Sequence, residues 1–325
     1  MISIIGSGNW ATTIACLLAK NNPQMSIRMW CRNEMIIDNR SLADWINIDR
    51  QNIKYLPSVQ IPKNVSAHPL ISDATSNCRY IVFCVPHQYI QSVVDTMQPI
   101  PGAIGMSLIK GEGISQIIST ALDLDVCVMM GANIASEVAQ GYFAESTIGC
   151  NDLKLGAEWR SLFHSSKFVI DAVTTDLKGV EIMGTLKNVI ALAAGFTDGL
   201  KWGWNSKASV IRRGIHEMIE LSKELIGPHP DRDSLAFLSC GIADLICSSC
   251  GGRNRSIAER MVTGNTTWEE EERLHLNGQK LQGPETAITI GKWLAANELE
   301  QKFPFFCKIR EIVDGESAYD TLFCE

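Results

Sequence analysis

Short apolar runs alternate with helix-like segments in the first half of the chain. Residues 2–5 form an apolar run, and residues 10–19 then place apolar side chains at helical spacing. Further apolar runs follow at 26–31, 79–85, 103–109 and 126–131. Alternation of short strands and amphipathic helices is typical of a parallel sheet covered by helices. The pattern therefore predicts an α/β domain in this half of the chain.

The stretch between residues 33 and 78 departs from this alternation. It is polar and contains Pro57, Pro62 and Pro69, and proline interrupts regular backbone hydrogen bonding. We expect an irregular, elaborated crossover in this part of the chain.

After about residue 175 the strand-like runs fade and a helical pattern takes over. Residues 176–199 carry apolar side chains at a spacing dense enough for a largely buried helix. We therefore expect an α/β fold with two domains. An N-terminal Rossmann-type doubly wound sheet would occupy residues 1–176, and an all-α C-terminal domain would occupy residues 177–325.

The first turn of the chain carries a glycine motif. Gly6, Gly8 and Ala11 fit the pattern G-x-G-x-x-A directly after the first apolar run. In a Rossmann turn the first glycine permits a tight bend and the second lets the backbone approach a pyrophosphate. The third small residue lets helix and strand pack closely, and the helix N-terminus attracts the phosphates. The motif and its position predict dinucleotide binding.

The residues after the second apolar run leave the choice of dinucleotide open. A Rossmann domain that binds NAD usually places an acidic residue here to bind the ribose. The chain has the sequence Cys31-Arg32-Asn33-Glu34 here, so its first acidic residue, Glu34, lies beyond the expected position at the strand end. Arg32 would suit a 2′-phosphate, or it is an ordinary surface cation. We expect NAD, with NADP as the alternative.

Two charged residues stand inside apolar helical segments of the second half. Lys187 lies in the expected buried helix, and Asp244 is flanked by isoleucine, alanine and leucine. A buried charge is costly unless it is paired, so each residue is a candidate partner of the other. A paired lysine could donate a proton to a carbonyl under reduction. The structural alternatives are a solvent-exposed helix edge for Lys187, and a helix cap or an exposed turn for Asp244.

A glycine-rich basic segment follows. Gly251-Gly252-Arg253-Asn254-Arg255-Ser256 precedes a helical pattern, and such a helix start with a guanidinium is a good anion site. The alternative is an ordinary helix cap by Asn254 or Ser256. Together with a nucleotide fold, these residues indicate an oxidoreductase acting on a small phosphorylated carbonyl compound.

The composition excludes some functions and narrows others. The formal net charge of −7 argues against general nucleic-acid binding. The 11 cysteines are odd in number and scattered in apolar runs, which favours reduced thiols in a reducing compartment. The close pair Cys247 and Cys250 would suit a redox or metal site, but it lacks a second pair or a histidine cluster, so we expect ordinary structural thiols there. The acidic run 269–272 is expected to be a solvated helix face.

Targeting signals are not evident. No basic region followed by an apolar stretch opens the chain. The most apolar stretch, residues 189–196, is far shorter than the roughly 20 residues of a membrane span. We expect a cytoplasmic protein with no membrane partner.

Several segments together resemble one enzyme family, the soluble NAD-dependent glycerol-3-phosphate dehydrogenases. The resemblance covers nearly the whole chain in order. It is carried by GSGNWATTIA, VPHQYI, SLIKGEG, GANIASEVA, LKNVIA, GFTDGL, GGRNR and LNGQKLQGPETA. It implies reversible reduction of dihydroxyacetone phosphate to sn-glycerol 3-phosphate by NADH. It also implies a Rossmann domain, a helical domain and a homodimer.

The resemblance further implies roles for individual residues. Lys187 would be the catalytic proton donor, Asp244 would support it electrostatically, and Lys110 would orient the substrate and polarise its carbonyl. The residues implied in substrate binding are Asn188, Ser248, Arg253 and Asn254. Those implied in cofactor binding are Gly6, Ser7, Gly8, Asn9, Trp10, Pro86, Arg253, Lys280 and Gln282, with His87 beside them.

Two rival functions are consistent with a Rossmann turn alone. One is a dehydrogenase of another hydroxyacid or sugar acid, which would lack the GGRNR segment. The other is a silent NADH-binding sensor, which would have lost Lys187, Lys110 or Asp244, whereas this chain has all three.

Overall fold

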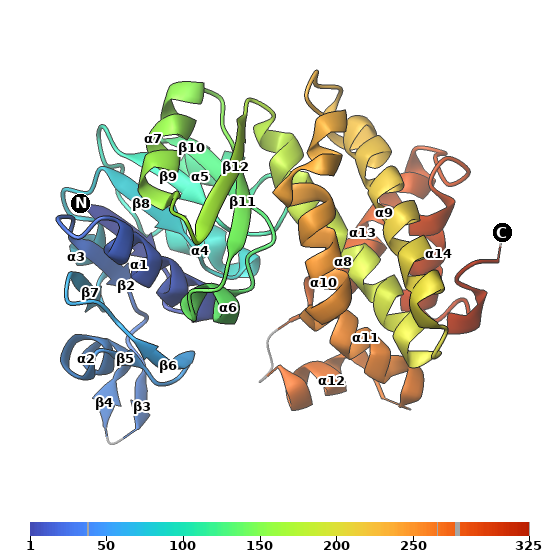
Figure 1. Ribbon diagram of the computed structural model, residues 1–325, viewed down its shortest axis with the longest axis horizontal. Coiled ribbons are helices and arrows are strands. Elements are labelled where there is room, and N and C mark those ends of the chain that lie inside the picture. Colours follow the sequence, from blue (N-terminus) through green and yellow to red (C-terminus); the bar gives the residue numbers. More distant parts are fainter. Residues whose placement is uncertain (38, 265, 277–279, 325) are drawn as a thin grey trace. The chain divides into compact units, whose positions relative to one another are not determined.

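The computed structural model describes residues 1–37, 39–264, 266–276 and 280–324 (Figure 1). The described chain forms two compact units, Met1–Glu181 and Ile182–Glu325. Each unit has its own architecture, and the boundary between them falls within one long helix.

The first unit is built on an eight-stranded sheet with the order β12-β11-β10-β9-β8-β1-β2-β7 (Figure 1). Neighbouring strands are parallel except for the β10–β11 pair, which is antiparallel. The strands are β1 (Ile2–Ile5), β2 (Ile27–Trp30), β7 (Val65–His68), β8 (Tyr80–Phe83), β9 (Ile104–Ser107), β10 (Asp125–Met130), β11 (Ala144–Gly149) and β12 (Phe168–Thr174).

The strand order reverses direction at β1. The chain runs from β1 outward to β2 and β7, then returns to the other side of β1 and continues through β8, β9 and β10. This is the doubly wound Rossmann order, so the predicted fold class is confirmed. In such a sheet, ligands bind at the carboxyl ends of the strands where the order reverses, here between β1 and β8.

Helices cover both faces of the sheet. Helices α1 (Asn9–Asn21) and α7 (Leu153–Phe163) pack on one face with residues such as Ile4 and Met106. Helices α4 (Ile90–Val94) and α5 (Ile114–Leu122) pack on the other face. The remaining helices of this unit are α3 (Ile71–Thr75) and α6 (Ala135–Ala139).

The expectation of an irregular crossover at 33–78 is only partly correct. The segment contains the third strand of the main sheet, β7, and two small hairpins. The hairpin strands are β3 (Met35–Ile37), β4 (Arg40–Ser41), β5 (Gln51–Asn52) and β6 (Leu56–Gln60). The short helix α2 (Leu42–Asp44) and a π-turn at Trp45–Asp49 lie between them.

The second unit consists of helices around a buried one. Helix α8 (Leu177–Gly199), predicted at 176–199, is long and apolar enough to cross a membrane, but that apolar stretch is entirely buried as in a core helix. The others are α9 (Gly203–Ile226), α10 (Asp244–Gly251), α11 (Arg253–Thr263), α12 (Trp268–His275), α13 (Gln282–Ala296) and α14 (Pro304–Val313). Short helical turns occupy His87–Tyr89 in the first unit and Asp233–Phe237, Ser239–Ala243 and Tyr319–Thr321 in the second.

Glycines let other helices approach α8 closely. A Cβ at Gly195 would lie 2.3 Å from the Arg255 carbonyl oxygen and 2.6 Å from the Ala258 Cβ, both on α11. A Cβ at Gly214 of α9 would lie 2.4 Å from Ile190. Since no side chain larger than hydrogen fits, the segment that carries Lys187 is fixed between α9 and α11.

Candidate active site

The turn after β1 has the geometry of a dinucleotide-binding loop. Gly6 adopts φ +134°, and a Cβ there would lie 2.3 Å from the Cys84 carbonyl oxygen. A Cβ at Gly8 would meet nothing within 4 Å. Helix α1 begins directly after Gly8, with neither a side-chain cap nor an acidic residue in its first turn. Gly6 thus permits the bend, and Gly8 leaves space over the helix start.

These features fit the pyrophosphate of a dinucleotide. Phosphates bind at helix N-termini because backbone N–H groups and the helix dipole both attract negative charge. Among the predicted residues of this turn, Ser7, Gly8 and Trp10 are half-buried and Asn9 is exposed. Ala11 is fully buried beneath them, where a small residue lets α1 pack on β1.

Three loops meet at the carboxyl edge of the sheet in the first unit. The turn at Gly6 contacts Cys84, two residues before the exposed Pro86. A Cβ at Gly111 would lie 3.5 Å from the His87 Cβ, so the loop after β9 lies beside the loop after β8. Lys110 is half-buried in that third loop. The structure thus gathers the predicted residues of this unit at one sheet edge.

A buried carboxylate holds the end of the loop that carries Lys110. Glu181 is 3% exposed, and its Oε1 accepts the Ser115 N–H at 2.8 Å while its Oε2 accepts the Ser115 hydroxyl at 3.1 Å. Burial raises the pKa of Glu181 to about 7, although hydrogen bonds from Ser115 and Gly113 oppose the rise. Glu181 therefore serves as a cap for α5, supplied from α8.

In the second unit, Lys187 contacts a carboxylate and a hydroxyl group. Its side chain is 2% exposed, and its ammonium group forms an ion pair with Asp244 at the start of α10. Lys187 Nζ also donates a hydrogen bond to Ser248 Oγ at 2.7 Å. The ion pair expected between Lys187 and Asp244 is present. Because a carboxylate and a hydroxyl fix its position, the ammonium group points in one defined direction.

A chain of amides lies next to this pair. Asn254 Nδ2 donates to Asn188 Oδ1 at 3.0 Å, and Asn188 Nδ2 donates to Gln282 Oε1 at 3.4 Å. The Gly283 N–H donates to Asn254 Oδ1 at 3.0 Å. These contacts join α8, α11 and the first turn of α13. The predicted residues Asn188, Asn254 and Gln282 thus form one network.

The start of α11 differs from an ordinary capped helix. Its N-cap is Gly252, with no capping side chain, so the alternative of a cap by Asn254 or Ser256 is wrong. Asn254 instead turns to the amide network. The Arg253 side chain is exposed, and partial desolvation lowers the pKa of its guanidinium, which remains charged. A cation and an uncapped helix N-terminus are therefore together at Arg253.

The acidic run at 269–272 is not a uniformly solvated face, contrary to expectation. Glu271 and Glu272 are 5% and 6% exposed. Glu272 accepts the Leu281 N–H at 2.9 Å and pairs with the predicted cofactor residue Lys280 at 2.8 Å. The run therefore holds the beginning of α13, which carries Gln282. Lys280 itself is exposed, and its neighbours 277–279 lie outside the described residues.

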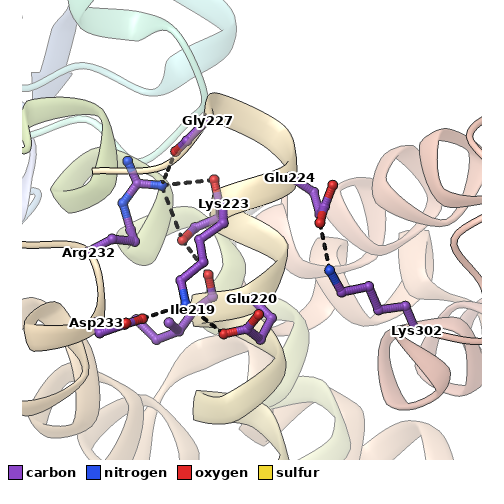
Figure 2. Close-up of polar contacts among 9 residues, drawn as sticks. Ile219, Glu220, Lys223, Glu224, Gly227, Arg232, Asp233 and Lys302 are labelled. Atoms are coloured by element: carbon purple, nitrogen blue, oxygen red, sulfur yellow. Dashed lines mark hydrogen bonds and ion pairs between the residues drawn. The ribbon is translucent and has the colours of Figure 1, made fainter. Parts of the chain in front are cut away.

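An open groove of about 510 Å³ along α9 is an alternative location for a bound ligand. One cation of its lining, Lys223, is already paired, as Figure 2 shows: it lies between Glu220 at 2.7 Å and Asp233 at 2.6 Å. Arg232 is 2% exposed and donates to the Ser222 and Gly227 carbonyl oxygens at 2.9 and 3.0 Å. These contacts hold the segment after α9, and we assign no ligand to the groove.

Cysteines and acidic groups provide no metal site in the described part of the chain. All 11 cysteines are free thiols, and the described residues contain no group of three or more potential metal ligands. Cys247 is half-buried and Cys250 exposed on α10.

Both units match protein families with known members. Residues 1–156 match the family model of the NAD-dependent glycerol-3-phosphate dehydrogenase N-terminus, and residues 176–323 match that of the C-terminus. The cytoplasmic NAD(+) glycerol-3-phosphate dehydrogenase of Drosophila melanogaster is 43% identical over 331 residues, covering 97% of this chain and 90% of that protein. This chain belongs to the NAD-dependent glycerol-3-phosphate dehydrogenase family.

Solved structures of the family agree in fold. Glycerol-3-phosphate dehydrogenase from Plasmodium falciparum matches with a TM-score of 0.91 and 34% identity, covering 100% of this chain and 95% of that one. The enzyme from Saccharomyces cerevisiae matches with a TM-score of 0.88 and 32% identity, covering 99% and 97%. The family matches show that the chain is an NAD-dependent oxidoreductase.

Proposed function

We propose that this glycerol-3-phosphate dehydrogenase interconverts dihydroxyacetone phosphate and sn-glycerol 3-phosphate with NAD(H), and that Lys187 transfers the proton. The observation that carries the proposal is the buried ammonium group of Lys187, held by Asp244 and Ser248 beside an amide network. In functional terms, we assign residues 1–176 mainly to cofactor binding and residues 177–325 mainly to substrate binding and catalysis.

The first unit would hold the cofactor, whose nicotinamide supplies or accepts the hydride when bound. The backbone of Gly6, Ser7 and Gly8 and the start of α1 would bind the pyrophosphate, for the geometric reasons given above. Other residues that we propose on the cofactor side are Asn9, Trp10, Pro86, Arg253, Lys280 and Gln282.

Lys187 would exchange a proton with the substrate oxygen. As the carbonyl is reduced, its oxygen gains negative charge, and a fixed cation stabilises that charge without reorganisation. The ammonium group then gives its proton to the alkoxide, and in the reverse direction the amine takes it back. Asp244 keeps the charged form favourable inside the protein, while Lys110 would orient and polarise the carbonyl.

The start of α11 would bind the substrate phosphate. A guanidinium recognises phosphate through paired N–H donors, and the helix N-terminus adds N–H groups of its own. Arg253 and Asn254 lie at this start, Asn188 is hydrogen-bonded to Asn254, and Ser248 is hydrogen-bonded to Lys187. Binding the phosphate away from the reacting carbon lets remote binding energy position that carbon.

We further propose a cytoplasmic homodimer without nucleic-acid or membrane partners. The Drosophila relatives carry the word cytoplasmic in their names. The homodimer follows from the family resemblance, and sedimentation of the purified protein at twice the mass of one chain would support it. A monomer at working concentrations would contradict it.

The experiment that tests the activity is oxidation of NADH followed by the loss of its absorbance. Dihydroxyacetone phosphate should support rapid oxidation, whereas unphosphorylated dihydroxyacetone and NADPH should not. NADH binding without turnover would indicate a sensor. Oxidation of NADH with the oxo form of a hydroxyacid, but not with dihydroxyacetone phosphate, would indicate a different substrate class.

A further inference from the structure

A fully buried asparagine lies behind the glycine turn of the first unit. Asn52, at the end of β5, is 0% exposed. Its Nδ2 donates to the Ser7 carbonyl oxygen at 2.8 Å and to Thr12 Oγ1 at 2.8 Å. The Asn52 amide group therefore donates one hydrogen bond to the glycine turn and one to helix α1, which follows the turn.

The orientation of this amide is fixed by a third contact. Asn52 Oδ1 accepts the Tyr55 N–H at 3.0 Å, and only the oxygen of the amide can accept a backbone donor. The NH₂ group must therefore face Ser7 and Thr12. The tight β5–β6 hairpin thus sets both the position and the orientation of Asn52.

Thr12 continues the chain of hydrogen bonds to the second glycine. Its hydroxyl accepts from Asn52 and donates to the Gly8 carbonyl oxygen at 2.9 Å. The Thr12 N–H also donates to Gly8, at 3.0 Å. The carbonyl groups of both Ser7 and Gly8 are consequently held on the protein side of the turn.

Peptide geometry gives these contacts a consequence for the ligand. In a planar trans peptide the C=O and the following N–H point in opposite directions. Holding the Ser7 carbonyl toward Asn52 therefore directs the Gly8 N–H away from it. Holding the Gly8 carbonyl in the same way directs the Asn9 N–H out of the helix start.

We propose that Asn52, together with Thr12, is a positioning residue that presets the Gly6–Gly8 turn for the cofactor's pyrophosphate. The proposal rests on NADH binding at this turn. Asn52 does not touch the cofactor and acts through the backbone of Ser7 and Gly8. The small β5–β6 hairpin, an insertion within the crossover, thereby acquires a role in cofactor affinity.

A role of Asn52 in merely fastening its hairpin to the sheet explains these contacts less well than a role in positioning the glycine turn. The insertion is fastened to β7 by other groups: Asn47 exchanges two hydrogen bonds of 2.8 Å with Ala67, and Arg50 donates to the Val65 carbonyl oxygen at 2.8 Å. Outside its own hairpin, the side-chain contacts of Asn52 go to Ser7 and Thr12. Its removal should therefore affect the turn more than the hairpin.

The test measures NADH affinity by fluorescence titration in the absence of substrate. Asn52→Ala should raise the Kd of NADH about tenfold, because the buried amide that holds the Ser7 carbonyl and the Thr12 hydroxyl is lost. At saturating NADH, kcat and the KM for dihydroxyacetone phosphate should stay within about twofold of wild type, since the loss lies in cofactor binding. The KM for NADH should rise with the Kd.

Asn64→Ala is the matched control. Asn64 Nδ2 also donates to main-chain carbonyl oxygens, but to one near the end of α1, Ala19 at 3.2 Å, and to one in the turn that follows α1, Met25 at 3.0 Å. This variant should keep the Kd of NADH. If Asn52→Ala and Asn64→Ala weaken NADH equally, or if Asn52→Ala leaves the Kd unchanged, the proposal is overturned.

A second pair of variants covers the case in which Asn52→Ala does not fold. Thr12→Val removes the hydroxyl that joins Asn52 to Gly8, while Thr12→Ser keeps it. The valine variant should weaken NADH binding and the serine variant should restore it. Equal affinities would overturn the proposal. Wild-type protein that binds NADH without turning over dihydroxyacetone phosphate would refute the proposed function but leave this comparison valid.

Discussion

Lys187 and Asp244 are almost completely buried, so neither charge can be removed alone without a large cost. Breaking a buried ion pair by deleting one partner costs about 3–5 kcal/mol because the other charge remains unpaired. We therefore expect Lys187→Met to lower the free energy of unfolding by about that amount. Lys187→Met combined with Asp244→Asn should recover most of it. Urea denaturation measures both.

Activity should behave differently from stability in the same variants. Loss of a general acid lowers kcat by a factor of about 10² or more, and restoring neutrality does not replace the proton. In both variants kcat with dihydroxyacetone phosphate should therefore stay about 10²-fold or more below wild type, while NADH still binds. A double variant with wild-type kcat would remove Lys187 from the mechanism.

Arg253 offers a test of phosphate recognition at a single side chain. Arg253→Ala should chiefly raise the KM for dihydroxyacetone phosphate, by about tenfold or more, because a charge-assisted bond to phosphate is lost. Arg260→Ala, an exposed arginine near the other end of α11, should leave KM unchanged. Steady-state kinetics that show the same KM in both variants would place the phosphate elsewhere.

At the scale of residues, the sequence predicted the pairing of Lys187 with Asp244 but not the contacts of Asn52. The pairing of Lys187 with Asp244 follows from the cost of burying either charge in an apolar helix. The sequence did not indicate that Asn52 is buried, because an asparagine in a polar, proline-containing segment is typical of an exposed loop. Its importance comes from a contact 45 residues away, with the carbonyl of Ser7.

At the scale of elements, buried glutamates recur as caps for helices elsewhere in the chain. Glu181 caps α5, Glu217 accepts the Phe305 and Phe306 N–H groups at the start of α14, and Glu272 accepts at the start of α13. Each carboxylate satisfies N–H groups that a helix start leaves without intrahelical partners. Burial also raises the pKa of Glu217.

Glu181 makes the stability of the protein depend on pH near neutrality. Burial raises its pKa to about 7, with Glu112 adding to the rise, whereas the unfolded chain titrates near the ordinary value of about 4.3. The folded protein therefore holds a proton that the unfolded chain has lost. This contribution to stability is complete below the unfolded pKa and disappears as pH rises through about 7.

We expect Glu181→Gln to flatten this dependence. Between about pH 6 and about pH 8, the wild type should lose roughly 1 kcal/mol more of its free energy of unfolding than the variant does. Denaturation curves at several pH values measure the difference. Glu137→Gln, on an exposed side chain, should retain the wild-type slope. Parallel slopes for wild type and Glu181→Gln would show that Glu181 does not titrate in this range.

The predicted elements were most accurate where burial was uniform. Strand β1 lies exactly at the predicted residues 2–5, and α8 differs from its predicted range by one residue. Strand β11 escaped prediction because Ser146 and Thr147 are buried in it, and their hydroxyls bond to Asn133 and Asp171. The folded chain supplies hydrogen-bond partners that allow these hydroxyls to be buried. The strand therefore has no continuous apolar run that would predict it from the sequence.

At the scale of the molecule, the two units should respond to different ligands. NADH alone should protect amides around residues 6–12 from hydrogen exchange, and glycerol 3-phosphate alone should protect those around 252–258. A ligand at a hundredfold excess over its Kd adds about 2.7 kcal/mol to the stability of the state that binds it. Exchange measured by mass spectrometry resolves the segments. Protection by NADH confined to residues 182–325 would contradict the assignment of the cofactor to the first unit.

The glutamate caps also bear on the order in which the chain folds. Glu181 and Glu217 join residues that are 66 and 88 positions apart in sequence. Helix α5 has only 9 residues, too few to persist alone in water. It can be completed only after α8 arrives, late in folding, so Glu181→Gln should accelerate unfolding while leaving the refolding rate nearly unchanged.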